Sequence, residues 1–163
     1  MDCMDRVNRI LQHHMYRECL AQIRKFEQER IFCGHDMSHF LDVARLAHLF
    51  NLEEGLKIDR EKIYAAALLH DVGRHIQYMD GTPHQEAGVP LAAKILEECG
   101  FEEDEQEEIL AAVLSHRDKN VREEKNLAGI IYRADKMSRA CYGCAARDMC
   151  DWDDTKKNLT LEF

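Results

Sequence analysis

Adjacent titratable residues stand at the end of a predicted helix, in the stretch LLHDVGRH at positions 68–75. His70 and Asp71 follow two leucines and come shortly before Gly73. A buried carboxylate without a partner is costly, and a bound metal ion offsets that cost directly. The pair is therefore either a hydrogen-bonded core pair or part of a metal site.

Further residues of the same two types lie on or beside apolar segments elsewhere in the chain. They are His39, His84, His116 and Asp135. Imidazole and carboxylate together suit divalent Fe, Mn, Zn and Ni. Residues this far apart in sequence can meet only if their helices pack as a bundle with the ligands facing inward. Taken one at a time, each could also be a hydrogen-bonded core residue.

Hydrophobic residues recur at three- and four-residue steps along most of the chain, which predicts helices. We expect these over about residues 4–29, 39–55, 59–73, 89–99, 103–115 and 127–141, with a loop over 74–88 and an irregular tail after Cys150. No segment alternates with period two over more than a few residues, and there is no internal repeat or linker. We therefore expect residues 1–163 to form one all-α domain.

Composition limits the function classes. The 163 residues, 45% hydrophobic and 33% charged, describe an ordinary globular domain. A formal net charge of -9 argues against broad binding to nucleic acid, which requires a basic surface. No apolar run approaches the roughly 20 residues that span a bilayer. The N-terminus carries acid where a signal peptide carries base, so we expect a cytoplasmic protein without a membrane partner.

The order of these residues resembles that of a known family. The order runs from His39 through AALLHDVGR, which contains His70 and Asp71, to His84, His116 and Asp135. Over about residues 35–140, this order resembles that of the HD-domain superfamily of metal-dependent phosphohydrolases. The family is named for its His-Asp dyad. The resemblance implies an HD-domain helical bundle, here of about six helices, and hydrolysis of a phosphomonoester or phosphodiester of a small metabolite by a metal-activated water.

The resemblance also implies the ligands. Four residues match the family's first metal, two more match a second, and Asp71 would bridge the two ions. The first set is His39, His70, Asp71 and Asp135, and the added pair is His84 and His116. We expect a binuclear centre over a mononuclear one, holding Fe, Mn, Ni or Zn. His70, Asp71 and Arg74 would then be catalytic.

Basic residues beside the ligands are candidates for substrate phosphate. Arg74 stands where many family members have lysine, and it offers a planar fork in place of a point charge. Arg117 and Lys136 are weaker candidates for the same role, against solvated or capping roles. Asp42 replaces an arginine of several family members, and it would either orient His39 or face water. We expect a small phosphorylated substrate, a nucleotide first, and a monomer or homodimer.

Seven cysteines include a cluster, CYGCAARDMC, with a C-x2-C-x5-C pattern. Cys141, Cys144 and Cys150 lie just past Asp135, and Cys33 is a candidate fourth member. Such thiols are compatible with zinc or an iron–sulfur cluster. Free thiols and a disulfide are the alternatives, and the odd number of cysteines excludes complete pairing within the chain.

Two other functions fit the same sequence. The chain could be a metal or nucleotide sensor of the HD fold that has kept its ligands and lost turnover. It could also be a redox-responsive binding module in which the cysteine cluster is the main feature. The presence of all six ligand positions favours the enzyme.

Overall fold

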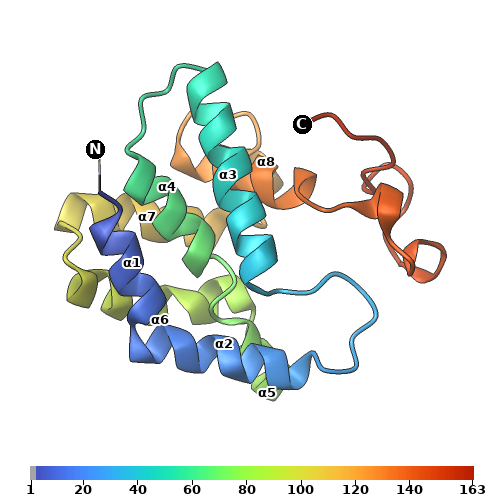
Figure 1. Ribbon diagram of the computed structural model, residues 1–163, viewed down its shortest axis with the longest axis horizontal. Coiled ribbons are helices and arrows are strands. Elements are labelled where there is room, and N and C mark those ends of the chain that lie inside the picture. Colours follow the sequence, from blue (N-terminus) through green and yellow to red (C-terminus); the bar gives the residue numbers. More distant parts are fainter. Residues whose placement is uncertain (1–2) are drawn as a thin grey trace.

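The computed structural model describes residues 3–163, and every regular element in that range is helical (Figure 1). Met1 and Asp2, part of the acidic N-terminal stretch, lie outside the described residues. The α-helices are α1 (Asp5–Gln12), α2 (His14–Phe26), α3 (Met37–Glu53), α4 (Arg60–Leu69), α5 (Arg74–Asp80), α6 (His84–Cys99), α7 (Glu103–Ser115) and α8 (Leu127–Met137). Short 3-10 turns are η1 (Lys119–Val121), η2 (Cys141–Gly143) and η3 (Arg147–Met149). The predicted all-α class is confirmed.

The helix predicted over residues 4–29 is two helices, because the backbone at His13 is extended (φ −66°, ψ 126°). The ring of His13 is held by Glu98 of α6, with 2.7 Å between Nε2 and Oε2. The hydrophobic periodicity continues across the break, so the sequence pattern did not reveal it. The break lets α1 pack against α4 and α6 while α2 reaches α5.

The loop predicted over residues 74–88 was wrong. Helix α5 fills its first half and ends at Gly81, whose positive φ of 83° suits glycine. Helix α6 begins at His84, with Pro83 as its N-cap, rather than at Val89. Proline is favoured near a helix start, where its missing N–H is not needed. The turn-forming pairs Asp80-Gly81 and Thr82-Pro83 therefore mark a tight connection between two helices and not a long loop.

Helix α8 ends at Met137, earlier than the predicted residue 141. The side-chain amide of Asn158 donates to the carbonyls of Lys136 and Arg139, both at 2.8 Å, and so satisfies groups at the helix end. The partner comes from the tail, and a local pattern cannot show it. The predicted end of the helix over 59–73 is also late, since α4 stops at Leu69 and a turn follows.

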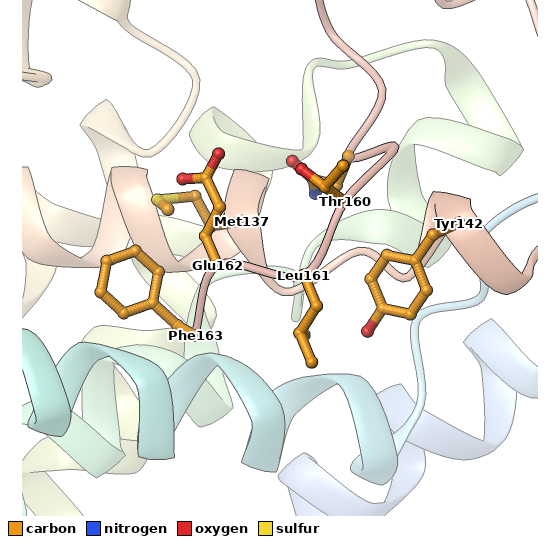
Figure 2. A pocket seen from close by; sticks show the side chains of 7 residues that line it. Met137, Tyr142, Thr160, Leu161, Glu162 and Phe163 are labelled. Atoms are coloured by element: carbon orange, nitrogen blue, oxygen red, sulfur yellow. The ribbon is translucent and has the colours of Figure 1, made fainter.

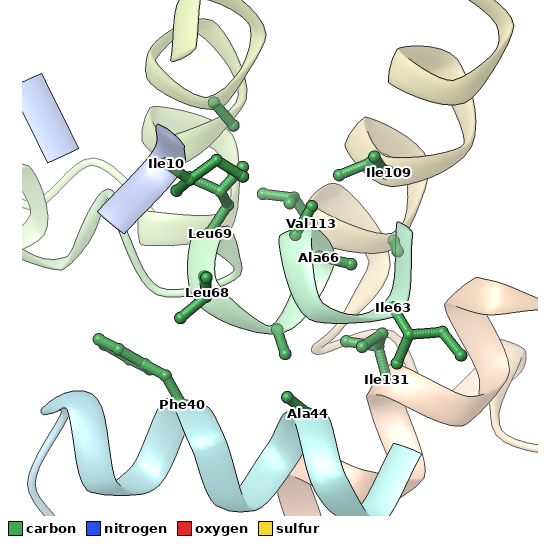
Figure 3. Packing of buried hydrophobic residues seen from close by; sticks show 14 of the residues in the cluster. Ile10, Phe40, Ala44, Ile63, Ala66, Leu68, Leu69, Ile109, Val113 and Ile131 are labelled. Carbon is green, nitrogen blue, oxygen red and sulfur yellow. The ribbon is translucent and has the colours of Figure 1, made fainter. Parts of the chain in front are cut away.

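Helix α4 lies at the centre of the core, packed against α1, α3, α7 and α8 (Figure 1). Its residues from Ala65 to Leu69 have no exposed surface, and three of them are alanines, which allow close approach from several sides. Figure 3 shows Leu68 and Leu69 of α4 among Phe40 of α3 and Val113 of α7. This burial places the next residues of the chain, His70 and Asp71, in the interior.

The tail after Cys150 is irregular, as predicted from its polar composition, and the short turns η2 and η3 precede it. It folds back so that Phe163 packs edge-on against Phe50 of α3, with ring centroids 5.1 Å apart. The hollow beside it, lined by residues that include Tyr142 and Leu161, measures about 30 Å³ (Figure 2). That volume accommodates about one water molecule. Among the described residues, no helix combines the length and apolarity needed to cross a membrane.

Candidate metal centre

Helix α3 contributes His39 from its first turn. The side chain of Asp36 caps the helix by accepting a hydrogen bond from the backbone N–H of His39 at 3.1 Å. The His39 ring is only 6% exposed and lies edge-on to the ring of His70, with centroids 5.4 Å apart. The N-cap therefore fixes the helix start from which His39 projects into the core.

The end of α4 contributes His70 and Asp71, which are 0% and 2% exposed. The Nδ1 of His70 donates to the carbonyl of Ala67 at 2.7 Å, so its Nε2 carries the lone pair and faces the interior. The chain leaves α4 through a turn in which Val72 N–H bonds the Leu69 carbonyl. This turn lets two consecutive side chains point at the same interior volume.

The first ligand set consists of His39, His70, Asp71 and Asp135, and its four ligand atoms lie within 4.8 Å of one another. The Nε2 of His70 is 3.0 Å from Asp71 Oδ2 and 3.5 Å from Asp135 Oδ1. The Nε2 of His39 is 3.7 Å and 3.2 Å from the same two oxygens. Two imidazole nitrogens and two carboxylate oxygens thus surround one point.

The second ligand set consists of Asp71, His84 and His116, also within 4.8 Å of one another. It uses the other oxygen of Asp71, since Oδ1 is 3.2 Å from His84 Nε2 and 3.6 Å from His116 Nε2. The two histidine Nε2 atoms are 3.0 Å apart, and both side chains are 1% exposed. Asp71 therefore lies between the sets with one oxygen facing each, the position that a bridging ligand would need.

Outer hydrogen bonds orient the histidines of the second set. His116 Nδ1 donates to the carbonyl of Val113 at 2.7 Å, and His84 Nδ1 donates to Oε1 of Gln77 at 2.6 Å. Each bond fixes the tautomer and leaves the Nε2 lone pair facing Asp71. Gln77 also accepts from the backbone N–H of His84 at 3.1 Å. Gln77 was not among the predicted site residues, because it lies on α5, where a loop was predicted.

Two nitrogens of the first set lack hydrogen bonds. The Nε2 atoms of His39 and His70 are fully buried and have no hydrogen-bond partner in the described structure, although carboxylate oxygens lie nearby. A buried polar atom without a partner is unfavourable, because it has lost its bond to water. A divalent ion among these atoms would satisfy both nitrogens and the carboxylates at once, so the residues fit a metal.

The charges of the centre also fit. Burial opposes ionisation of Asp71, but the polar histidine rings around it outweigh burial, so the pKa of Asp71 lies well below its ordinary value. The pKa of Asp135 is lowered in the same way, against burial, by His39 and His70. Burial lowers the pKa of His84 to about 4, and it lowers the pKa of His116 as well. The second set is therefore ionised at its carboxylate and neutral at its imidazoles, the forms that bind metals.

Basic side chains lie at the edge of the centre. Arg74 Nε is 3.3 Å from Asp71 Oδ1, and its side chain is 22% exposed. Lys136 Nζ is 2.6 Å from Asp135 Oδ2 and 37% exposed. Both cations thus contact a carboxylate of the centre and reach solvent. Arg117 is exposed beside His116, and in the described structure its side chain forms no hydrogen bond or ion pair with the ligand sets.

Asp42 and His35 both lie near His39, but Asp42 is exposed and His35 is buried. Asp42 is exposed in the cleft that His39 also lines, and it makes no hydrogen bond to His39 in the described structure. The orienting role expected as one alternative for Asp42 is therefore not seen. His35, which the sequence analysis did not select, is 5% exposed and lies edge-on to His39 with centroids 6.0 Å apart.

Glu27 holds His35 in place. Its carboxylate accepts from the His35 backbone N–H at 2.9 Å, pairs with His35 Nδ1 at 2.7 Å and accepts from the Tyr78 hydroxyl at 2.8 Å. Burial raises the pKa of Glu27, but the bonds from His35 and Tyr78 outweigh it and bring the value to about 2. No spacing rule joins these residues, since they come from the end of α2, the following loop and α5.

Comparison with known proteins identifies the family. The family model for the HD domain matches residues 37–140, more than half of the chain. This protein therefore belongs to the HD-domain family.

An uncharacterized protein of Clostridium beijerinckii is 45% identical over 160 residues, covering 98% of this chain and 100% of the relative. The crystal structure of a predicted HD superfamily hydrolase from an uncultured Thermotogales bacterium matches with a TM-score of 0.61 and 28% identity, covering 88% of this chain and 81% of that one. Ribonuclease Y of Oleidesulfovibrio alaskensis is 26% identical over 128 residues, and the chain spans 22% of that relative's length.

Proposed function

We propose that this protein is a metal-dependent phosphohydrolase with a binuclear centre, acting on a small phosphorylated metabolite of the nucleotide class. The observation that carries the proposal is the position of Asp71, whose two carboxylate oxygens face two separate ligand sets. A carboxylate with a single structural partner would not need both oxygens directed at histidine nitrogens that are fixed as acceptors.

The residues of the chain would divide the work. Divalent ions, if bound at the two sets, would activate a water and neutralise negative charge on phosphoryl oxygens. His39, His70, Asp71 and Asp135 would hold the first ion, whereas His84 and His116 would complete the second site around Asp71. The hydrogen bonds from the histidine Nδ1 atoms to backbone and Gln77 keep these ligands oriented without reorganisation.

Arg74 and Lys136 support a phosphorylated substrate. Each cation contacts one carboxylate of the centre and is partly open to solvent, so a phosphoryl group entering there would meet both. The guanidinium of Arg74 can bind two phosphoryl oxygens at once, whereas Lys136 acts as a point charge. Arg117 would assist from the rim.

The charge of the chain favours a small substrate over RNA. The relatives named ribonuclease Y support phosphoester chemistry, and so does the structural neighbour described as a hydrolase. A net charge of -9 on 163 residues, however, repels a long polyanion, and the two partly exposed cations offer local attraction for a single phosphorylated group.

The test is turnover by the metal-loaded protein. The purified chain, supplied with Mn²⁺ or Fe²⁺, would be assayed against nucleoside mono-, di- and triphosphates, a generic phosphomonoester, a phosphodiester and a short RNA. We expect phosphate or nucleotide release from a small substrate, abolished in Asp71→Ala and retained in His14→Ala, a control at an exposed histidine. Metal-loaded protein that turns over none of them would contradict the enzyme and favour the sensor, and cleavage of RNA alone would contradict the substrate class.

A further inference from the structure

Four of the seven cysteines come from two segments on one side of the molecule. Cys33 lies in the loop between α2 and α3, and Cys141, Cys144 and Cys150 lie in the tail that follows α8. Figure 1 shows this loop and the first part of the tail on the same side, away from the N-terminus. More than a hundred residues of sequence separate the two segments.

A cleft joins the two segments. Cys33, Cys141 and Cys144 line one cleft of about 300 Å³, together with residues of the α3 start that include His39. Arg139 closes one side of it by donating from Nη1 to the carbonyl of Gly34 at 2.8 Å. Three thiols thus share one cavity next to the metal centre.

The fourth thiol belongs to the same group. Burial raises the pKa of Cys33 and Arg139 opposes the change, while Cys141, Cys144 and Cys150 raise it further. Cys150 is also only partly exposed, and two consecutive backbone turns connect it to Cys144. All four thiols are free, and none is fully exposed.

The backbone presents the three tail cysteines at successive turns. Cys144 N–H bonds the Cys141 carbonyl at 3.2 Å, Arg147 N–H bonds the Cys144 carbonyl at 3.3 Å, and Cys150 N–H bonds the Arg147 carbonyl at 3.4 Å. Each turn advances the chain by three residues and begins or ends at a cysteine. The segment is therefore a series of tight turns, with a cysteine at the start or end of each turn.

This segment has little core of its own. Between residues 140 and 163, the buried side chains are those of Cys141 and Ala146. Irregular segments that bury so little apolar surface are usually held by disulfides or bound metal. The three thiols of this segment form no disulfide, and together with Cys33 they number four, the number of ligands that a tetrahedral metal site requires.

We propose that Cys33, Cys141, Cys144 and Cys150 form a second metal site, made only of thiolates and separate from the HD centre. Its occupant is a thiophilic metal, either a zinc ion or an iron–sulfur cluster, since both take four cysteine ligands. The site would fasten the tail to the loop before α3, and so would support the helix start that carries His39.

The sulfurs are more widely separated than a zinc site requires. Zinc bonds of about 2.3 Å in a tetrahedron place the sulfurs about 3.8 Å apart. In the part of the chain that the structure describes, no three of these sulfurs lie within 4.8 Å of one another. A cluster holds its cysteines farther apart, because several iron and sulfide atoms lie between them, and the cleft offers such room.

The experiment measures metal on the full chain, purified without exposure to air. Iron, zinc and acid-labile sulfide would be counted per chain, and the visible absorption spectrum recorded, for the wild type and for Cys144→Ser, Cys150→Ser and Cys3→Ser. Cys3 is exposed and outside the group, so Cys3→Ser is the matched control. His70→Ala distinguishes the two metal sites, and far-UV circular dichroism checks that each variant is folded.

The expected result is metal that depends on the four thiols and not on His70. Sulfide with absorption near 400 nm, lost in Cys144→Ser and Cys150→Ser but kept in His70→Ala and Cys3→Ser, identifies a cluster. One zinc per chain with the same dependence identifies a zinc ion at the same site. Metal counts unchanged by both cysteine variants in folded protein, or a wild type that binds no thiolate-dependent metal, would overturn the proposal.

Discussion

Gly73 lies where the turn that follows His70 and Asp71 meets the start of α6. The methyl group added by Gly73→Ala should push this turn and α6 apart. Its backbone (φ −83°, ψ 0°) is open to any residue, so conformational freedom is not the reason for glycine. A Cβ would lie 2.3 Å from the carbonyl oxygen of His84 and 2.5 Å from the backbone nitrogen of Gly88. Backbone atoms cannot rotate away, so Gly73→Ala must move α6.

The size of the movement follows from these distances. Ordinary contact with a methyl carbon begins near 3.4 Å, so α6 and the turn must separate by at least about 1 Å. Overpacking of this kind costs about 2–3 kcal/mol of unfolding free energy. His84 moves with α6, whereas Asp71 stays with α4. Metal–ligand distances tolerate about 0.2 Å, so the second ligand set should lose its ion.

The assay compares Gly73→Ala with Gly143→Ala, since a Cβ at Gly143 meets nothing within 4 Å. Chemical denaturation gives the unfolding free energy, and elemental analysis gives metal per chain. We expect a loss of about 2–3 kcal/mol and of one metal for the first variant, and changes below about 0.5 kcal/mol for the control. Wild-type stability together with wild-type metal content in Gly73→Ala would refute the reasoning.

Other variants test the centre and its surroundings. Asp71→Asn should reduce binding at both ligand sets, whereas His84→Ala should reduce the metal count by one and leave the first ion, both measured by elemental analysis; equal losses would contradict the bridge. Gln77→Ala should weaken the second ion about 10–100-fold in a chelator competition, because His84 loses the acceptor that orients it, and unchanged affinity would dismiss that role. Glu27→Gln should lower the unfolding free energy by about 2 kcal/mol at pH 7. Because the Glu27 pKa falls from 4.5 to about 2 on folding, that difference is full above pH 4.5 and shrinks toward pH 2, and a gap unchanged at pH 3 would count against it.

The sequence alone was sufficient for the helical class and the residue types of the centre. Apolar steps of three and four residues predict helices whatever their neighbours, and they placed α3, α4 and α7 near their observed bounds. His70 and Asp71 could be selected because two titratable groups in an apolar stretch conflict with simple burial. The six proposed metal ligands could then be assembled by resemblance, in their order along the chain.

Tertiary structure decided how those residues meet. Periodicity describes one face of one helix, so it could not show the break at His13 or the tail residue Asn158 that caps α8. It also gave no sign of Gln77 and His35, whose roles depend on contacts between segments.

The division of Asp71 between two ligand sets is likewise a tertiary result. It requires α4 to be buried at the centre of the bundle, with α3 and α8 bringing one set and α6 and α7 the other. Sequence determines which groups can bind a metal, because that is a property of each side chain. Only the packing of the helices decides which oxygen of Asp71 faces which nitrogen, because that is a property of distances between elements.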